Sequence, residues 1–417
     1  MTATTTAALS SFLIEDARER PGDDPIFSLN AEAVRRAGAG ERIINATLGA
    51  LVEDDGQLAI LPIVGEAISR VRQRDAASYA PIAGEPRFLE AVIRDLYGSR
   101  PLARQSIAVA TPGGTGALHH AIVNFLEPGQ ALLTTKAYWG PYKTIAEHTR
   151  RRVETFEMFT ADGRLDVESF SVALKRQVKA QKRALVILNT PCHNPTGYSL
   201  DDRDWQGVCE ALREAANEAP VSLLVDYAYA HFGGEAAKGW LAHAESLGER
   251  VLLLCAWTAS KAFAQYGARI GALVASHPDA QSRVRIKNAL SFSCRGTWSN
   301  CNHLGMLAIA DLMNSPEDSA RVDAERDRLV KLLDERVEAF NTSARAAGFK
   351  YPRYEGGFFV TVFAKDPAGV AQHMREQGVF VVPIGGAVRI ALCSTPRDSV
   401  STLVRALEAA LKACGGH

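Results

Sequence analysis

The chain has 417 residues, of which 47% are hydrophobic, and it carries 47 basic and 47 acidic side chains. This length is sufficient for two domains, and the hydrophobic share predicts a globular protein with a sizeable core. A net charge of zero gives no sign of a nucleic-acid or membrane partner.

The cysteines and the N-terminus favour a cytoplasmic protein. The seven cysteines are odd in number and include no Cys-x-x-Cys pair, which indicates neither a disulfide framework nor a zinc site. Cys192 beside His193 could be two metal ligands, but a packing cysteine beside a hydrogen-bonded histidine is the better interpretation, and we expect no metal. Met1–Thr6 lacks the basic and apolar regions of a signal peptide, and no apolar run is long enough to cross a bilayer. We therefore expect a reducing cytoplasm and no membrane or nucleic-acid partner.

Short apolar runs alternate with helical patterns between about residues 100 and 275. The runs cover residues 107–110, 131–135, 153–159, 184–188, 222–225, 251–256 and 270–274. Most are too continuously apolar for half-exposed strands, which predicts an α/β domain with a mostly parallel sheet covered by helices on both faces. Ligands bind outside the carboxyl ends of the strands in such sheets, so polar residues after these runs are candidate site residues.

A smaller α/β unit is predicted towards the C-terminus. A long charged helix over 320–340 precedes apolar runs at 358–363, 379–382 and 388–392, with one helix before the last two runs and another at the C-terminus. We expect an N-terminal arm and part of the small domain over 1–48, a large domain over 49–318, and a small domain over 319–417. The arm is expected to pack against the small domain or a partner chain.

Three segments after predicted strands could hold an anion or a flat ring. The Gly-rich turn 111–117 opens a helix, whose free N–H groups favour an anion, although a plain strand-to-helix turn looks similar. Trp139 offers a flat face for stacking, but a tryptophan at a strand end otherwise usually belongs to the core. Asn194 lies in the rigid loop 190–197, where it could donate a hydrogen bond or cap its own turn.

Charged residues follow the later runs. Asp226 needs a cationic partner or several donors, unless it is a helix N-cap or part of a salt bridge, and Tyr229 could converge with it on one planar ligand. Lys261 alone would be taken for a surface lysine. A buried lysine, however, has a lowered pKa, and its neutral amine can form a Schiff base with a carbonyl. Arg269 could bind a phosphate bidentately. Together these groups are the parts of a pyridoxal phosphate site.

Two motifs resemble those of the class I aminotransferases among the fold-type I pyridoxal phosphate enzymes. They are Cys192-His193-Asn194-Pro195-Thr196-Gly197 and Ser260-Lys261 followed by Tyr266-Gly267-x-Arg269-x-Gly271. The likeness covers about residues 45–396 and is closest to the aspartate and aromatic aminotransferase branch. It implies the fold-type I architecture, with a seven-stranded sheet in the large domain, the cofactor pyridoxal 5'-phosphate, and a homodimer with shared active sites.

The resemblance implies a role for each residue of the cofactor site. Lys261 would form the Schiff base, and Asp226 would face the pyridine nitrogen. Tyr229 and Asn194 would donate to the phenolic oxygen, while Trp139 would stack on the ring. The phosphate would be held by Gly114, Thr115, Thr258, Arg269 and, from the neighbouring subunit, Tyr79.

The resemblance also implies a substrate side. Arg389 resembles the arginine that binds the α-carboxylate, and Arg295 resembles the one that crosses the dimer interface to the side-chain carboxylate of aspartate or glutamate. Gly49 resembles a glycine whose backbone contacts the bound carboxylate. Trp139 and Asn194 would contact the substrate as well.

Three residues depart from the aspartate enzymes. Tyr142 stands where those enzymes usually carry a histidine, Leu51 replaces a tyrosine or similar residue, and Gly113 replaces a serine in the phosphate turn. A leucine on the substrate side could suit a larger apolar side chain, so strict aspartate specificity does not follow.

We therefore expect a ping-pong aminotransferase. It would move an amino group between an L-amino acid (aspartate, glutamate or aromatic) and a 2-oxo acid such as 2-oxoglutarate. A β-lyase or decarboxylase on the same fold would use the same Lys261 and Asp226, but a dicarboxylate-binding Arg295 favours the transaminase. A pyridoxal phosphate-binding transcription regulator would need a DNA-binding domain, and the segment before Asn45 is too short and too little basic to be one.

Overall fold

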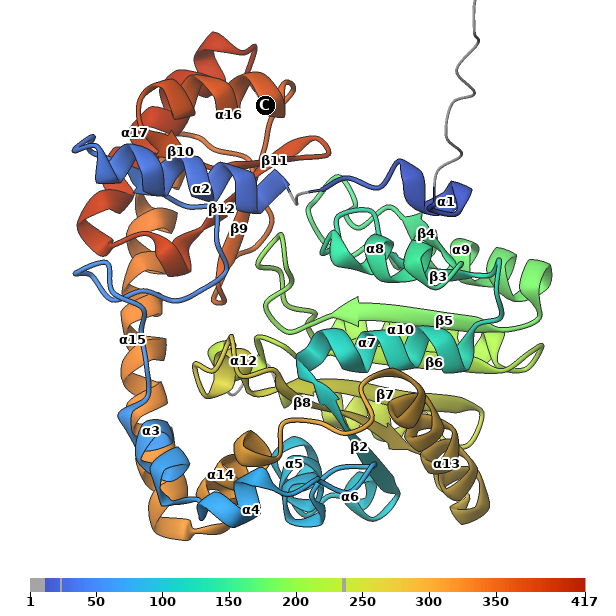
Figure 1. Cartoon of the computed structure of the whole chain (residues 1–417). Coiled ribbons are helices and arrows are strands. Elements are labelled where there is room, and N and C mark those ends of the chain that lie inside the picture. Colours follow the sequence, from blue (N-terminus) through green and yellow to red (C-terminus); the bar gives the residue numbers. More distant parts are fainter. Residues whose placement is uncertain (1–11, 23–24, 235–237, 417) are drawn as a thin grey trace, which may run out of the picture.

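The computed structural model of the chain describes residues 12–22, 25–234 and 238–416. A central sheet is covered by helices, and a smaller group of helices and short strands lies beside it (Figure 1). Residues 1–6, on which the expectation about a signal peptide rests, lie outside the described residues. Within the described residues, no helix combines the length and apolar character needed to cross a membrane.

Seven strands form the central sheet, in the order β2-β8-β7-β6-β5-β3-β4. Their bounds are β2 Ser106–Pro112, β3 Ala131–Thr135, β4 Arg152–Phe156, β5 Ala184–Asn189, β6 Val221–Asp226, β7 Val251–Thr258 and β8 Ile270–Ser276. Only β8 is antiparallel to its neighbours, so the predicted mostly parallel sheet is confirmed. The run expected at 153–159 ends earlier, at Phe156, because the chain turns back and Phe159 pairs with Leu165 in an isolated bridge.

Successive residues of the inner strands point into two separate cores, one on each face of the sheet. In β6, Leu223 belongs to one core and Leu224 to the other, and Leu253 and Leu254 of β7 divide in the same way. A strand that is buried on both faces must be apolar at nearly every position. This burial explains why these strands have continuous rather than alternating apolar sequences.

Helices cover both faces and connect the strands. They are α3 Pro62–Arg70, α4 Gln73–Ala77, α5 Pro86–Tyr97, α6 Pro101–Arg104, α7 Gly113–Phe125, α8 Pro141–His148, α9 Val167–Gln181, α10 Asp202–Ala215, the short η1 Ala230–Phe232, α11 Trp240–Glu245, α12 Ala259–Ala262, α13 Ala280–Thr297 and α14 His303–Asn314. Two of them start directly at the ends of strands. Helix α7 begins at Gly113 after β2, and α12 begins at Ala259 after β7, so both N-termini lie at the edge of the sheet.

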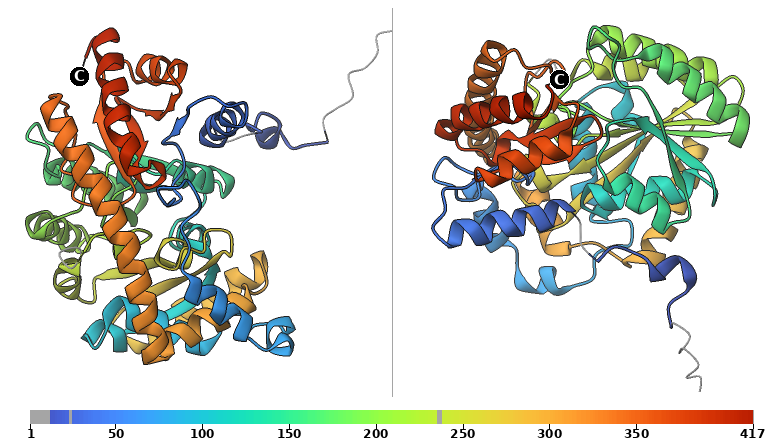
Figure 2. Two further views of the ribbon diagram at one scale, coloured as in Figure 1. Left: turned by 90° about the vertical axis from the view of Figure 1, so that its left-hand side faces the viewer. Right: turned by 90° about the horizontal axis from the view of Figure 1, so that it is seen from above.

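The smaller group begins with a helix that runs along the molecule. Its elements are α15 Pro316–Ala346, β9 Phe359–Phe363, α16 Pro367–Glu376, β10 Val379–Phe380, β11 Val382–Ile384, β12 Ala387–Ala391, η3 Leu392–Ser394 and α17 Arg397–Ala413. Strands β11, β12 and β9 form an antiparallel sheet. Helix α15 extends from α3 and α14 to α17 (Figure 1 and Figure 2). The boundary expected after residue 318 lies inside this helix, and the division into domains stays a prediction.

The N-terminal segment packs against the smaller group. It contains α1 Glu15–Arg18, α2 Pro25–Gly38 and β1 Ile44–Asn45, and β1 pairs in parallel with β10. Glu32 of α2 forms an ion pair with Arg375, and Arg36 donates to the carbonyl of Arg375 at 2.8 Å. The described part of this arm therefore packs against the smaller group.

Candidate active site

The carboxyl edge of the central sheet carries a row of polar residues. Asn189 ends β5 and lies opposite Asp226, which ends β6 and lies opposite Ala256 of β7. A cavity of about 160 Å³ opens at this edge. It is lined by Gly114, Thr115, Leu118, Trp139, Asn189, Asn194, Asp226, Ala228, Tyr229, Thr258, Ser260, Lys261 and Arg269. The structure thus brings together nine residues that the sequence predicted for a cofactor site. The nine are Gly114, Thr115, Trp139, Asn194, Asp226, Tyr229, Thr258, Lys261 and Arg269.

Asp226 is a buried carboxylate with one strong donor. The Tyr142 hydroxyl donates to its Oδ2 at 2.7 Å, and both side chains are buried. Burial raises the pKa of Asp226, while the Tyr142 hydroxyl and the charge of Lys261 oppose that rise. A carboxylate in this position gains free energy from a cationic N–H group such as a pyridinium. The ring of Tyr142 also meets the ring of Trp139 edge-on, at 5.8 Å between centroids.

Lys261 has the chemistry of a nucleophilic amine. Burial lowers the pKa of Lys261 to about 8, although the charge of Asp226 acts in the opposite direction. Its Nζ lies 5.1 Å from the centre of the Tyr229 ring. A lowered pKa increases the neutral fraction of the amine near neutral pH, and only the neutral amine attacks a carbonyl.

Asn194 has an unused polar atom in the cavity wall. Its Nδ2 donates to the Tyr229 hydroxyl at 3.2 Å, whereas its buried Oδ1 has no hydrogen-bond partner among the described residues. A half-turn of the amide exchanges the two ends, so this side chain can offer either a donor or an acceptor to a ligand. Asn189 fixes the backbone here: its Oδ1 accepts from the Asn194 N–H at 2.5 Å, and its Nδ2 donates to the Asp226 carbonyl at 2.9 Å.

An anion cradle lies at the start of α7. Gly113 has φ +68°, a left-handed conformation that favours glycine, and a Cβ there would lie 2.6 Å from Nη2 of Arg269. Arg269 is held by the Tyr266 carbonyl at 2.8 Å, and its Nη2 lies 3.5 Å from Oγ1 of Thr115. Free N–H groups at a helix N-terminus beside a fixed guanidinium suit a phosphate group.

Two polar lining residues were missed by the sequence reasoning. Asn189 stands directly after the apolar run 184–188, and that position was its available signal. Ser260 precedes Lys261, and its Oγ accepts from Thr258 at 3.0 Å. Ser260 is part of the Ser260-Lys261 motif. Nothing in the local sequence, however, distinguishes a serine that lines the cavity from one that caps a helix.

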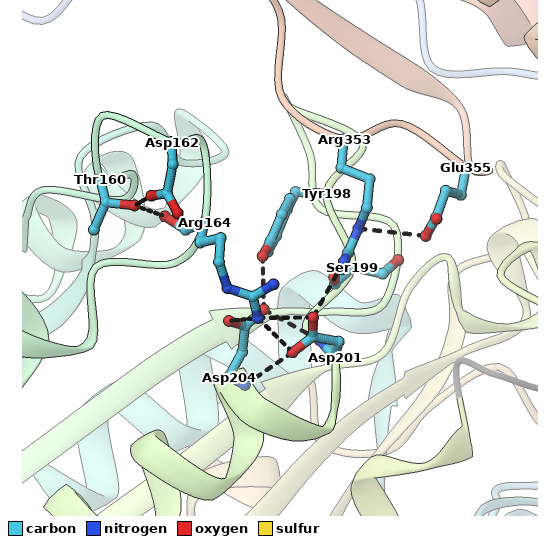
Figure 3. A network of polar contacts seen from close by, with 9 residues as sticks. All are labelled: Thr160, Asp162, Arg164, Tyr198, Ser199, Asp201, Asp204, Arg353 and Glu355. Atoms are coloured by element: carbon cyan, nitrogen blue, oxygen red, sulfur yellow. Dashed lines mark hydrogen bonds and ion pairs between the residues drawn. The ribbon is translucent and has the colours of Figure 1, made fainter.

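The loop that carries Asn194 is anchored from outside the cavity by the polar network drawn in Figure 3. Arg353, which precedes β9, donates to the Ser199 carbonyl at 2.7 Å and to Asp201 at 3.1 Å. Arg164 reaches the same Asp201 carboxylate at 2.8 Å. The network ties this loop to the segment that leads into β9.

Arg389 and Gly49 lie beside the cavity rather than in its lining. The buried Arg389 lies with its guanidinium carbon 4.6 Å from the centre of the Phe359 ring. The Phe359 ring in turn meets Tyr229 edge-on at 5.7 Å. A Cβ on Gly49 would come within 2.6 Å of Phe359, so only glycine fits there. One aromatic ring therefore separates Arg389 from a cavity residue.

Arg295 and Tyr79 are not brought into the cavity of their own chain. Tyr79 is 90% exposed, and Arg295 is exposed at the end of α13, where it donates to Ser299 Oγ. Both were expected to act on a neighbouring subunit, and those roles stay predictions.

Comparison with known proteins identifies the family. The family model for aminotransferase class I and II matches residues 42–407. The chain belongs to this family. It is 28% identical over 377 residues to an aromatic-amino-acid aminotransferase of Pseudomonas aeruginosa, which covers 88% of this chain and 92% of that one. An aspartate aminotransferase of the same organism is 24% identical over 396 residues, covering 92% and 96%.

Solved structures agree in fold. An aminotransferase from Anaerococcus prevotii has a TM-score of 0.92 and 30% identity, covering 96% of this chain and 99% of that one. An aromatic-amino-acid aminotransferase from Burkholderia pseudomallei, described as covalently bound to pyridoxal phosphate, has a TM-score of 0.77 and 23% identity over 94% and 98% of the two chains. The predicted family, the fold-type I architecture, the pyridoxal phosphate cofactor and the transaminase activity between amino acids and 2-oxo acids are therefore confirmed.

Proposed function

We propose that this aminotransferase takes aspartate, glutamate or an aromatic amino acid as donor and 2-oxoglutarate or a similar 2-oxo acid as acceptor, in ping-pong order. The relatives named for aromatic amino acids and for aspartate support this substrate class, because both align over most of the chain. The observation that carries the proposal is a single cavity lined by Lys261, Asp226, Tyr229 and Asn194.

The residues of the cavity fit the cofactor, and we assign their roles accordingly. Asp226 keeps the pyridine nitrogen protonated, and the hydrogen bond from the Tyr142 hydroxyl fixes the position of the Asp226 carboxylate. Asn194 and Tyr229 donate to the phenolic oxygen, and Trp139 stacks on the ring. The phosphate is bound by Gly114, Thr115, Thr258 and Arg269. When bound, pyridoxal phosphate supplies a carbonyl carbon and an electron-accepting ring.

Lys261 moves the proton in this proposal. Its Nζ takes the α-proton of the amino acid and returns a proton in the second part of the transfer. Because the pKa of Lys261 is lowered to about 8, the amine can act as a base and its conjugate acid can act as an acid. A positioned base of this kind contributes about 10²- to 10⁴-fold to the rate.

Arginines orient the substrate. We assign the α-carboxylate to Arg389, with the backbone of Gly49 and the side chains of Trp139 and Asn194 beside it. The side-chain carboxylate of a dicarboxylic substrate is assigned to Arg295 of a second subunit. Bidentate pairing at both ends would fix the substrate's position relative to Lys261.

The second subunit is a further part of the proposal. Arg295 lies beside Phe292, which is 82% exposed, and Tyr79 lies near Ile82, which is 42% exposed. The two segments touch, since Cys294 Sγ donates to the Ile82 carbonyl at 3.0 Å. These exposed apolar side chains beside two predicted site residues mark the surface that we expect a second copy to cover, giving a homodimer.

Subunit mixing tests the shared site. Lys261→Ala and Arg295→Leu chains are mixed under conditions that exchange subunits. In a mixed dimer, one site combines an intact Lys261 with an intact Arg295 from the partner chain. At low concentrations of dicarboxylic substrates, we expect the mixture to be clearly more active than either variant alone. A mixture as inactive as its components, in spite of proven exchange, contradicts the role of Arg295 in a second subunit.

A donor panel tests the reaction. The holoenzyme is incubated with 2-oxoglutarate and each candidate donor, and glutamate and the new oxo acid are measured. We expect both products in equal amounts, and without an acceptor no more oxo acid than the single equivalent per active site that one half-reaction releases. A β-lyase or a decarboxylase on this fold would instead form product when 2-oxoglutarate is left out.

We also propose that the protein works in the cytoplasm, with small-molecule substrates and no membrane or nucleic-acid partner. The support is that all seven cysteines are free thiols, the state that a reducing compartment maintains.

A further inference from the structure

Arg336 of α15 is a fully buried arginine that lies outside the lining of the cofactor cavity. Its guanidinium is always charged, and burial of that charge costs free energy unless hydrogen bonds and a nearby carboxylate offset the loss of water. The groups that Arg336 contacts therefore indicate what this buried charge stabilises.

The guanidinium of Arg336 joins two main-chain segments. Its Nη1 donates to the carbonyl of Cys393 at 2.9 Å and to that of Leu392 at 3.4 Å, and its Nη2 donates to the carbonyl of Val52 at 2.8 Å. The Val52 N–H also donates to the Cys393 carbonyl, at 2.9 Å. Arg336 thus holds the segment that contains Val52 against η3, the short helix that follows β12.

Asp54 supplies a counter-charge for Arg336. Its Oδ1 accepts from Nη2 of Arg336 at 2.8 Å, and it also accepts from the N–H of Arg397, the first residue of α17, at 2.9 Å. Burial raises the pKa of Asp54, but the hydrogen bonds from Arg397 and Arg336 outweigh burial and hold that pKa below its usual value. The carboxylate is therefore charged at neutral pH, and it connects the buried guanidinium to α17.

The same two segments carry the groups that we assign to the α-carboxylate of the substrate. Gly49 belongs to the first segment, and Arg389 lies in β12, which leads directly into η3. The segments also contact each other here, because Arg389 donates to the Thr47 carbonyl and the Ala391 N–H donates to the Ala46 carbonyl at 3.0 Å. A shift of one segment past the other would change the distance between Arg389 and the backbone of Gly49.

We propose that Arg336, together with Asp54, is a positioning residue that fixes the Gly49 segment against the strand of Arg389. This arrangement preforms the part of the active site that binds the α-carboxylate. The two segments lie near opposite ends of the chain, so no short stretch of backbone sets the distance between them. The inference rests on the roles proposed above for Arg389 and Gly49.

Loss of this positioning should affect every substrate, because all amino acids and 2-oxo acids of this reaction carry the carboxylate that Arg389 is proposed to bind. The expected pattern thus differs from that of Arg295, whose loss should affect dicarboxylic substrates alone. The carboxylate is held both before and during the reaction, so the main change should be in KM rather than in kcat.

Steady-state kinetics of the holoenzyme test the proposal, with aspartate as a dicarboxylic donor and phenylalanine as a monocarboxylic one. Arg336→Met should raise KM for both donors about tenfold or more, and the milder Asp54→Ala should raise it about threefold to tenfold. We expect kcat to change by less than about threefold in both variants. If Arg336→Met does not fold, Asp54→Ala decides by the same criteria.

Arg328→Met is the matched control. Arg328 lies about two turns before Arg336 on α15, and it binds the Glu53 carboxylate of the same segment at 2.8 and 3.0 Å. It therefore contacts a side chain of this segment, whereas Arg336 contacts the main chain of both segments. We expect KM in Arg328→Met to stay within about twofold of the wild-type value. An equal rise of KM in Arg328→Met and Arg336→Met would overturn the proposal.

Amide hydrogen exchange of the apoenzyme tests the positioning without any reaction. Peptides that cover residues 46–54 and 389–394 should exchange faster in Arg336→Met and in Asp54→Ala than in wild type. Peptides of β6 and β7 should be unchanged. A merely structural role would instead speed exchange throughout the protein and lower the fraction of active enzyme, which reduces kcat and leaves KM unchanged.

Two results overturn the proposal. One is a wild-type KM for both donors in Arg336→Met and Asp54→Ala, and the other is faster exchange in all peptides with a loss confined to kcat. Arg389→Leu separates this failure from a failure of the proposed function. If Arg389→Leu raises KM for both donors and the other two variants do not, only the positioning role of Arg336 fails. If Arg389→Leu leaves KM unchanged, the assignment of the α-carboxylate to Arg389 fails as well.

Discussion

The cofactor side and the substrate side of this active site differ in how much of each a single chain completes. Lys261, Asp226 and Asn194 line one cavity and are connected through buried neighbours. Arg295 of the substrate side lies exposed on the outside of the same chain, as does one residue expected to bind the cofactor phosphate of a neighbouring subunit, Tyr79. One folded chain thus brings together the residues that contact the reacting part of the cofactor. In our proposal, the side chain of the substrate is bound by Arg295 of a second copy.

Lys261→Ala tests the cofactor side most severely. We expect kcat to fall by about 10²- to 10⁴-fold, the contribution of a positioned base, and the visible absorbance of the covalently held cofactor to disappear. Lys143→Ala, which changes an exposed lysine of α8, is the control. Normal turnover and absorbance in Lys261→Ala would exclude the role assigned to this amine.

Asp226→Ala tests the same side through electrostatics. We expect kcat to fall by about 10²- to 10³-fold, comparable to the loss of one preorganised charge-stabilising group, with the cofactor still bound. The reason is that no carboxylate then keeps the pyridine nitrogen protonated. Asp226→Asn keeps the shape of the side chain without its charge. A variant that removes the α-proton at the normal rate, measured with α-deuterated donor, would contradict this assignment.

Arg295→Leu tests the substrate side. Loss of a hydrogen bond between charged groups should raise KM for dicarboxylic substrates about ten- to a hundredfold, with little change for monocarboxylic donors. Arg285→Leu changes an exposed arginine of the same helix and serves as the matched control. Equal losses on both substrate classes would show that Arg295 does not bind the side chain.

The pH dependence of cofactor capture sharpens the comparison. Only neutral Lys261 attacks the carbonyl, and the neutral fraction rises as pH passes upward through the pKa of about 8. Capture of pyridoxal phosphate by the apoenzyme should therefore level off above pH 8 and slow about tenfold for each pH unit below it. Rapid-mixing absorbance measures this rate. A rate that stays constant on both sides of pH 8 would mean that Lys261 is already neutral or is not the reacting amine.

Tyr142→Phe has the smallest expected effect. It removes the hydroxyl that opposes the rise in the pKa of Asp226, so that pKa should increase and the carboxylate should hold a pyridinium less well. We expect the dissociation constant of pyridoxal phosphate to rise about threefold to tenfold, the contribution of one ordinary hydrogen bond. Tyr138→Phe is the control, since Tyr138 stacks parallel to Tyr142 at 6.2 Å. If both variants bind pyridoxal phosphate with the same affinity, Tyr142 does not position Asp226.

Much of the cofactor side could be predicted because it is local. Asp226, Lys261 and the glycine turn each follow a strand within a few residues, and continuous apolar runs mark those strands. The hydrogen bond of Tyr142 was not predictable in this way. The bond joins α8 to β6, and no spacing in the sequence records a contact between residues so far apart.

The sequence by itself determined the family, the sheet and the identity of the cofactor, because these depend on residue types at the ends of strands. Only the tertiary structure decided which groups meet. It gave Gly113 a left-handed backbone beside the Arg269 guanidinium, placed Phe359 between Arg389 and Tyr229, and left Arg295 on the surface. Such contacts depend on packing between distant segments, and packing is a property of the folded chain.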